Sequence, residues 1–163
     1  MSKPRPTDPL ALLDALNAAA VEYIVIGGAA AVLHGAPVTT QDLDIVHRLT
    51  PANAARLGRV LGAIHATVRE PGSRHLEPDA ALLLAGGQLR LITDFGPLDV
   101  LGRLHDGRSY DDLLSRSEEV RDAERHVRVV DLPTLIEIKG GSGRRRDRLV
   151  VPILQEVLAQ RRS

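Results

Sequence analysis

The stretch Thr39-Thr40-Gln41-Asp42-Leu43-Asp44-Ile45-Val46 places two carboxylates two residues apart inside a run that is otherwise typical of a buried strand. Side chains of a β-strand alternate between its two faces, so Asp42 and Asp44 would project to one side and the apolar residues to the other. Two neighbouring carboxylates repel each other unless a positive charge lies between them. The stretch therefore predicts a half-buried strand whose acidic face needs a positively charged partner.

The chain around this stretch has the pattern of alternating helices and strands. Asp8-Pro9 is typical of a helix start, Asp131 is a candidate helix N-cap, and β-branched runs that end at glycines are typical of strands. The expected helices cover residues 9–19, 29–34, 51–64, 110–117, 131–139 and 147–162, and Pro152 either interrupts or starts the last one. The expected strands cover residues 21–26, 42–48, 88–96 and 97–104, with short ones around Val120 and at 126–130. We therefore expect an α/β (or α+β) fold with a mixed sheet, whereas residues 66–85 mix loop and apolar signals.

Composition narrows the classes of protein that the chain can belong to. Its 163 residues fit one domain over 1–163, with residues 1–7 as a flexible leader. Aromatic residues make up 2%, so the core must be aliphatic and recognition of nucleic acid by stacking is not expected. The formal net charge is zero, so any nucleic-acid contact must be local. The chain has no cysteine and no apolar run of membrane-spanning length, so we expect a cytoplasmic protein without membrane contact.

Three features could carry chemistry. Gly27-Gly28 lies between an expected strand and an expected helix, where backbone amides can bind a phosphate, although two glycines also make ordinary turns. The acidic pair on the next strand supplies the oxygen ligands that magnesium takes together with substrate phosphates, and a solvated edge strand is the alternative. Asp99, flanked by apolar residues on a later strand, would add a general base or a metal ligand if the two strands are neighbours. Taken alone, Asp99 is typical of a structural residue.

Together these features resemble the nucleotidyltransferase superfamily, whose pattern is a glycine turn, a helix, an acidic pair on a strand and a later acid. The string GGAAAVLHGAPVTTQDLDIV resembles the minimal bacterial type, which includes the AbiEii and MenT-like toxin nucleotidyltransferases. The segment DLPTLIEIKGGSGRRRDRLVVPIL resembles the C-terminal segment of that type, in which a helix ends in lysine and a basic loop leads to an aspartate that opens the last helix. The resemblance covers residues 21–47, 92–102 and 131–158.

The resemblance implies a mixed sheet flanked by helices, with further helices at the C-terminus, and magnesium-dependent transfer of a nucleotide from a nucleoside triphosphate. The residues implied to bind the nucleotide are Gly27, Gly28, Thr40, Lys139, Arg146 and Asp147. The residues implied to be catalytic are Asp42, Asp44, Asp99 and Lys139, the three aspartates also being the metal ligands. Two positions depart from the family pattern: Val38 stands where relatives often carry a basic residue, and Gly28 where many carry serine.

Lys139 can be assessed without the resemblance. It lies seven residues after Leu132 and four after Leu135, a spacing that places it on the apolar face of the expected helix. A buried cation is costly unless it is paired, so a phosphate or an acidic side chain is its expected partner. The alternative is a lysine that reaches from the last turn of the helix into solvent.

The densest basic patch is the segment Arg144–Arg148. From Lys139 to Ser163 there are 7 basic and 2 acidic residues, a local charge of +5. Such a patch could bind a triphosphate or a nucleic-acid backbone, such as a transfer RNA acceptor, and a solvated charged loop is the alternative. Asp147, inside the patch, could be a salt-bridge partner of its arginines or the N-cap of the final helix.

Three hypotheses for function follow from these residues and the resemblance. The first is a toxin of a toxin–antitoxin system that adds a nucleotide to the 3′ ends of transfer RNA and has a cognate antitoxin protein as partner. The second keeps the same chemistry but modifies a protein, as an antitoxin-type enzyme, or a drug. The third is a fold that binds nucleotide without catalysis, to which Val38 and Gly28 give some support.

Overall fold

The computed structural model describes residues 7–69 and 76–162. Seven strands form one mixed sheet in the order β3-β4-β5-β2-β1-β7-β6. The strands are β1 (Tyr23–Ile26), β2 (Leu43–His47), β3 (Thr67–Val68), β4 (Gln88–Thr93), β5 (Gly96–Leu101), β6 (Ser117–Asp122) and β7 (Arg125–Val130). The helices are α1 (Pro9–Ala18), α2 (Gly27–Leu33), α3 (Pro51–Ala63), α4 (Ala80–Leu84), α5 (Tyr110–Leu114), α6 (Leu132–Gly141) and α7 (Arg145–Arg162). The prediction of a mixed sheet flanked by helices, with helices at the C-terminal end, is confirmed.

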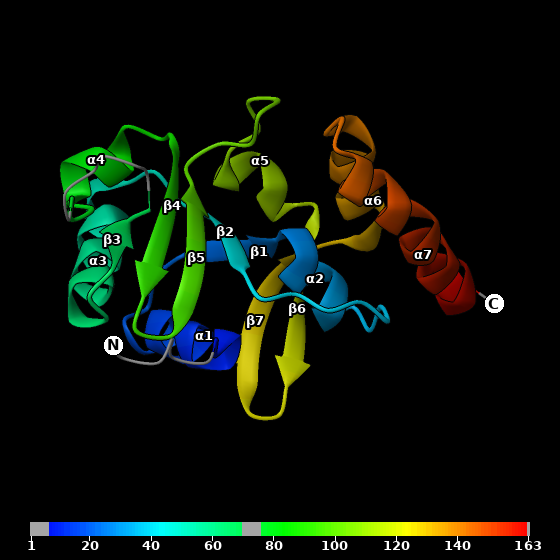
Figure 1. Ribbon diagram of the computed structural model, residues 1–163, viewed down its shortest axis with the longest axis horizontal. Coiled ribbons are helices and arrows are strands. Elements are labelled where there is room, and N and C mark those ends of the chain that lie inside the picture. Colours follow the sequence, from blue (N-terminus) through cyan, green and yellow to red (C-terminus); the bar gives the residue numbers. More distant parts are fainter. Residues whose placement is uncertain (1–6, 70–75, 163) are drawn as a thin grey trace.

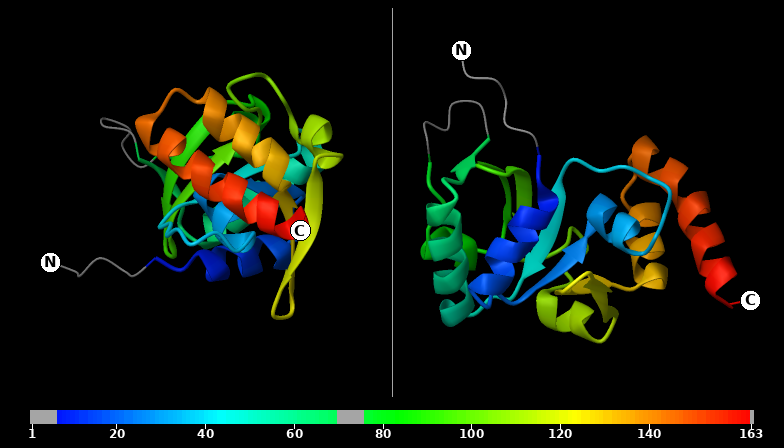
Figure 2. Two further views of the ribbon diagram at one scale, coloured as in Figure 1. Left: turned by 90° about the vertical axis from the view of Figure 1, so that its right-hand side faces the viewer. Right: turned by 90° about the horizontal axis from the view of Figure 1, so that it is seen from below.

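Two pairs of helices lie at opposite sides of the sheet (Figure 1). α3 and α4 pack on each other beside the β3–β4 end, whereas α6 and α7 pack on each other at the opposite side of the molecule. The views of Figure 2 show α2 lying between the sheet and α6, and α2 contacts β1, β2, β7 and α6. The elements that carry the glycine pair, the acidic strand and the C-terminal basic segment are therefore neighbours in space.

Strand pairing in the centre of the sheet is both parallel and antiparallel. β2 runs antiparallel to β1 and parallel to β5, and β1 also pairs with β7 in parallel through Val25 and Val129. The two central strands are rich in β-branched residues that are fully buried, including Ile24, Val25 and Ile45. The core is aliphatic, as the low aromatic content predicts.

Local sequence signals account for several element boundaries. The carboxylate of Asp8 accepts a hydrogen bond from the amide of Ala11 at 3.1 Å and Pro9 opens α1, so the predicted helix start is confirmed. The carboxylate of Asp131 accepts from the amide of Thr134 at 2.9 Å, which confirms the predicted N-cap of α6. In both cases the cap satisfies an amide that the first turn of the helix leaves without a partner.

Other boundaries differ from the sequence-based expectation. α2 begins at Gly27 itself, so the two glycines belong to the helix and not to a turn before it. β2 begins at Leu43, which leaves Asp42 one residue before the strand. α7 begins at Arg145 and continues through the exposed Pro152, which therefore neither starts nor interrupts it. Of the predicted leader, residues 1–6 lie outside the described residues.

The segment that sequence patterns left unassigned holds two short elements. β3 pairs antiparallel with β4, and α4 packs on α3; residues 70–75 lie outside the described residues. None of the helices in the described part of the chain is long and apolar enough to cross a membrane.

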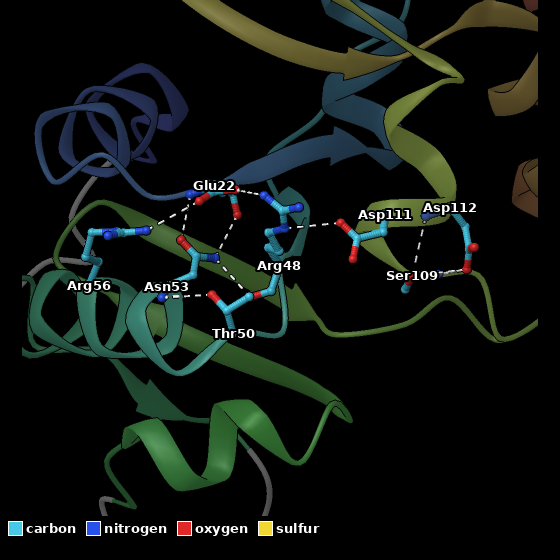
Figure 3. Close-up of polar contacts among 8 residues, drawn as sticks. All are labelled: Glu22, Arg48, Thr50, Asn53, Arg56, Ser109, Asp111 and Asp112. Atoms are coloured by element: carbon cyan, nitrogen blue, oxygen red, sulfur yellow. Dashed lines mark hydrogen bonds and ion pairs between the residues drawn. The ribbon is translucent and has the colours of Figure 1, made fainter.

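A polar network joins α3 and α5 to one end of the β1–β2 pair (Figure 3). At this end, Tyr23 at the start of β1 pairs with His47 at the end of β2. The fully buried side chain of Asn53 accepts a hydrogen bond from the amide of Glu22 at 2.7 Å and donates to the carbonyls of Glu22 and Arg48 at 2.9 and 3.0 Å. The Arg48 guanidinium lies 2.6 Å from the carboxylate of Glu22 and 3.1 Å from that of Asp111. Each of these charged groups therefore has an oppositely charged partner.

Candidate active site

A row of charged side chains crosses the neighbouring strands β2, β5 and β4, near the end of the β1–β2 pair where Ile26 pairs with Asp44. Asp44 of β2 lies directly opposite Asp99 of β5, and Asp99 lies directly opposite Arg90 of β4. Residues that pair directly across strands project to the same face of a sheet. The condition under which Asp99 would join the acidic pair, that the two strands are neighbours, is therefore met, and Arg90 lies next to Asp99 in the row.

Gly27 allows the first turn of α2 to approach Asp44 closely. Its φ of +68° is in the left-handed region that favours glycine, and a Cβ atom at this position would lie 2.3 Å from Oδ2 of Asp44. Both the backbone conformation and the contact exclude a larger residue. From the sequence, Gly27 is a turn residue and a candidate phosphate-binding residue, and the structure adds a packing requirement against the carboxylate.

Gly28 is close to Thr40 in the loop before β2. A Cβ atom at Gly28 would lie 2.9 Å from Oγ1 of Thr40, whose hydroxyl donates a hydrogen bond to the carbonyl of Asp42 at 3.0 Å. The Thr40 hydroxyl thus lies where the side chain of a serine at position 28 would begin. Gly28 stands where many relatives carry serine, and the Thr40 hydroxyl lies close to the place where that serine side chain would be.

The Asp44 carboxyl is electrostatically unfavourable as it stands. Burial raises its pKa to about 7, and the charges of Asp99 and Asp42 add to the effect, while Lys139 opposes it. Its Oδ1 atom is buried and has no hydrogen-bond partner within the described residues. A buried carboxylate oxygen without a partner is costly, so this atom has the property expected of a ligand for a cation.

Lys139 and Asp147 join α6 to α7 beside this carboxyl. The Lys139 side chain is buried, 8% exposed for the residue as a whole, and its Nζ lies 3.3 Å from Oδ1 of Asp147. The Ser142 hydroxyl donates to the other carboxylate oxygen of Asp147 at 2.6 Å. Although burial alone would raise it, the pKa of Asp147 is held below its usual value by this hydroxyl and by the Lys139 ammonium.

These contacts decide between the alternatives that the sequence left open. The partner of the buried Lys139 in this structure is an acidic side chain, not solvent. Asp147 lies inside α7 and is not its N-cap. Its contact ion pair is with Lys139, and among the neighbouring arginines the charge of Arg144 also helps to lower its pKa. The pair joins α6 to α7 next to the acidic row.

Two cavities meet at the acidic row. One has a volume of about 860 Å³ and the other about 400 Å³. Both are lined by Asp42, Asp44, Asp99, Lys139, Arg144 and Asp147. The smaller is also lined by Gly28, Thr40 and Arg146, and the larger by Gly27, Arg69, Arg90 and Arg103. Each site residue predicted from the sequence therefore lines at least one of the two cavities.

Three of the arginines were not singled out from the sequence. Arg69, Arg90 and Arg103 are isolated in the chain, so no local pattern marks them. The expected hairpin across Gly96-Pro97 was a usable signal for one of them, because its register places Arg90 opposite Asp99. Arg145 and Arg148 of the predicted basic patch do not line either cavity, whereas Arg144 and Arg146 do.

A third cavity, of about 920 Å³, lies between α1 and the β6–β7 turn and has a different character. Arg125 in its wall contacts Asp14 at 2.6 Å, and His126 hydrogen-bonds to Glu119. It contains neither the glycine turn nor the acidic row. Its larger volume alone does not make it the better candidate for a catalytic site.

The residues at the row have the chemistry of a magnesium site but are not arranged as a complete one. Asp42 and Asp44 offer hard oxygen ligands, and Asp44 Oδ1 has no competing partner in the described chain. Asp99, by contrast, accepts a hydrogen bond from Arg69 at 3.1 Å. Across residues 7–69 and 76–162, no group of three acidic, histidine or cysteine side chains is placed to hold a metal ion. Two aspartates therefore fit a metal, and the third is engaged elsewhere.

Sequence comparison by itself does not place the chain. A scan against models of protein families gives no match, and neither does a comparison with curated proteins.

Solved structures show that the chain has the fold of nucleotidyltransferases. The protein TM1012 from Thermotoga maritima, provisionally assigned as a nucleotidyltransferase, superposes with a TM-score of 0.56 at 21% sequence identity, over 96% of this chain and 97% of that one. LnuA, a lincosamide antibiotic adenylyltransferase solved with lincomycin bound, superposes with a TM-score of 0.64 at 15% identity, over 94% of this chain and 99% of that one. The resemblance to the AbiEii and MenT-like toxins stays a prediction.

Proposed function

We propose that this chain is a magnesium-dependent nucleotidyltransferase that moves a nucleotide from a nucleoside triphosphate to an acceptor hydroxyl. The observation that carries the proposal is the Asp44 carboxyl. It is raised in pKa by burial and by two neighbouring aspartates, lies against Gly27 and lacks a partner for Oδ1. Such a group is stabilised by a bound divalent cation, and nucleotidyl transfer uses that cation at the phosphates.

Each side chain of the row has a part in this mechanism. Asp42 and Asp44 would hold the metal, which when bound offsets the negative charge of the phosphates. The oxygen of the acceptor hydroxyl attacks the α-phosphorus, and the new oxygen–phosphorus bond forms as the bond from the α-phosphorus to pyrophosphate breaks. Asp99 takes up the proton of the hydroxyl. For that step Asp99 must give up its hydrogen bond from Arg69.

The smaller cavity is the proposed site of the triphosphate. Gly28 and Thr40 line it, and the Thr40 hydroxyl lies where a side chain at position 28 would begin, so it is the hydroxyl available to phosphate oxygens there. Arg146 and Lys139 supply positive charge, and a phosphate would compete with Asp147 for the Lys139 ammonium. Asp147 keeps that ammonium positioned when no phosphate is bound.

The acceptor defines two candidate functions. In the first, the acceptor is the 3′ end of a transfer RNA, as for the toxins that the sequence resembles, with a cognate antitoxin protein as partner. In the second, the acceptor is a small molecule or a protein, and the fold shared with the antibiotic adenylyltransferase LnuA over 94% of this chain supports a small molecule.

The test is transfer of label from each nucleoside triphosphate with magnesium, offered either total RNA or a panel of hydroxyl-bearing small molecules. Wild type is compared with Asp42→Asn and Asp44→Asn, and with Glu124→Gln as the matched control, because Glu124 is exposed and lies far from the row. We expect label transfer that requires both aspartates and survives in the control. Transfer that persists in the aspartate variants, or its absence from wild type with every acceptor, would reject the proposal.

A further inference from the structure

The two cavities differ in what they offer a ligand. The smaller one holds the proposed triphosphate site at Gly28, Thr40 and Arg146. The larger one extends from the same aspartates across β5 and β4, where Arg90 and Arg103 lie in its wall. If the triphosphate occupies the smaller cavity, an acceptor hydroxyl can reach Asp99 only from the larger one.

The larger cavity has positive charge that the protein only partly offsets, because Arg103 interacts with the carboxylate of Asp112 without direct contact. Its acidic groups are already engaged: Asp99 by Arg69 and Asp147 by Lys139, while the Asp42–Asp44 pair is the proposed metal site. Arg90 and Arg103 are exposed, and no hydrogen bond or ion pair of their guanidinium groups occurs within residues 7–69 and 76–162. Arginine binds phosphate through several parallel donors, so two unpaired guanidinium groups favour an anionic ligand.

The backbone holds these two arginines in place. Arg90 is in β4, directly opposite Asp99, and Arg103 follows β5 and forms a bridge with Ser109. Between them, Gly102 packs so tightly on Gly86 that a Cβ at position 102 would lie 2.5 Å from the Gly86 Cα. The rim of the cavity is therefore built from backbone segments in direct contact, not from a free loop.

We propose that the larger cavity is the acceptor site and that Arg90 and Arg103 bind the phosphodiester backbone of a single-stranded RNA acceptor, next to its reacting 3′-hydroxyl. The proposal rests on the nucleotidyltransferase function above. A backbone contact suits this chain because its few aromatic residues offer little for base stacking. The main acceptor contact is thereby moved to Arg90 and Arg103 from the Arg144–Arg148 segment, of which Arg146 lines only the smaller cavity and Arg144 lines both.

Arg69 connects the cavity wall that holds Arg90 and Arg103 to the acidic row at Asp99. Its guanidinium contacts Asp99 at 3.1 Å and lines the same cavity as Arg90 and Arg103. An acceptor phosphate that draws Arg69 away would leave Asp99 free to accept the hydroxyl proton. Binding of the acceptor and exposure of the base would then be one event.

The experiment measures binding of a 5′-labelled single-stranded RNA of about 12 nucleotides by fluorescence anisotropy. Wild type is compared with Arg90→Gln/Arg103→Gln and with the matched control Arg59→Gln/Arg121→Gln, which removes two exposed arginines outside both cavities. Binding is followed from about 50 to about 200 mM salt, because each lost phosphate contact lowers the salt slope by about 0.7 for a single strand. Binding of each magnesium–nucleoside triphosphate is measured in parallel.

We expect the Arg90/Arg103 variant to lose about 1.4 from the salt slope and on the order of tenfold in RNA affinity, while triphosphate binding and the control double variant stay at wild-type values. Equal RNA affinity in wild type and the Arg90/Arg103 variant, or an equal loss in the control variant, overturns the proposal, as does transfer only to small molecules. Failure of the nucleotidyltransferase function would look different, because wild type would then transfer label from no nucleoside triphosphate to any acceptor, whatever its affinity for RNA.

Discussion

The two ends of the antiparallel pair β1–β2 differ in whether their charged groups have partners. At one end, Glu22 and Arg48 are held by Asn53, and each charge and buried amide has a partner (Figure 3). At the other, Gly27 begins α2 against Asp44, whose carboxyl has a pKa raised to about 7 and an oxygen without a partner in the described chain. The buried Nδ1 of His47 at the first end also lacks a partner, but burial lowers the pKa of that ring to about 4 and keeps it neutral at pH 7. An unpartnered oxygen of a carboxyl that lies beside two other carboxylates is different, because it points to a cationic ligand.

The largest expected effect comes from removing the unsatisfied charge. Asp44→Asn should lower nucleotide transfer by at least about a hundredfold, because it removes a metal ligand and the charge beside the phosphates. The same change should stabilise the metal-free protein at pH 8 by about 1–3 kcal/mol, because it removes a buried carboxylate that has two acidic neighbours. Transfer assays and denaturant unfolding in the presence of a chelator measure the two effects.

Magnesium supplies the control for this variant. It should raise the unfolding midpoint of wild type and leave that of Asp44→Asn almost unchanged, because a ligand stabilises only the state that binds it. A variant that is less stable than wild type in chelator would show that Asp44 is a structural residue.

Removing the centre of the satisfied network should have the opposite pattern. Asn53→Ala leaves the Glu22 amide without a partner, whereas the Glu22 and Arg48 carbonyls each keep one backbone donor, so we expect a loss of about 1–3 kcal/mol in stability with unchanged affinity for magnesium–triphosphate. Arg56→Gln is the control, because its guanidinium contacts Glu22 at 3.4 Å on the surface, and it should cost less than about 1 kcal/mol. If Asn53→Ala lost nucleotide binding but kept its stability, the conclusion that this end of the β1–β2 pair only stabilises the fold would be wrong.

The two ends of β2 should also titrate in opposite directions. The folded-state pKa of Asp44 is raised from 3.8 to about 7, so its contribution to stability is present below pH 3.8 and is lost as pH rises through 7. Burial lowers the pKa of His47 from 6.5 to about 4, so its contribution is present above pH 6.5 and is lost as pH falls through 4. Between about pH 4 and 6.5 the two slopes, each about 1.4 kcal/mol per pH unit, oppose each other.

Each of these two slopes of stability against pH should become measurable in the presence of a chelator when the other titrating residue is replaced. Relative to wild type, stability of His47→Leu should fall more steeply as pH rises across this window, and that of Asp44→Asn should rise. Urea unfolding at intervals of half a pH unit measures both. Parallel curves for all three proteins would mean that neither group has the shifted pKa.

The smallest expected effect concerns the glycine next to Thr40. Gly28→Ser should destabilise the protein by about 1 kcal/mol, because its Cβ would lie 2.9 Å from the Thr40 hydroxyl, and Thr40→Ala should recover part of that loss. Gly27→Ala is the comparison, since its φ of +68° and its contact with Asp44 cannot be relieved by a change at Thr40. Additive effects of Gly28→Ser and Thr40→Ala would contradict the contact.

Sequence patterns predict what depends on neighbours along the chain. Helix caps at Asp8 and Asp131 and the β4–β5 hairpin that places Arg90 opposite Asp99 rest on local residue types, and all three occur. The pairing of Val25 with Val129 and the ion pair of Arg69 with Asp99 join segments that have no shared local pattern. Such contacts are decided by how the whole sheet assembles, so the candidate residues could be named from the sequence but not their partners.

The pairing of Lys139 with Asp147 beside Asp44 also bears on how the protein is made. Asp44 is synthesised about a hundred residues before this pair, so a nascent chain that has folded only β1 to β5 carries the acidic row without its buried lysine. An interrupted translation product would therefore lack part of the proposed triphosphate site and should be unable to consume nucleotide. Activity would appear only when synthesis has passed α6 and the start of α7.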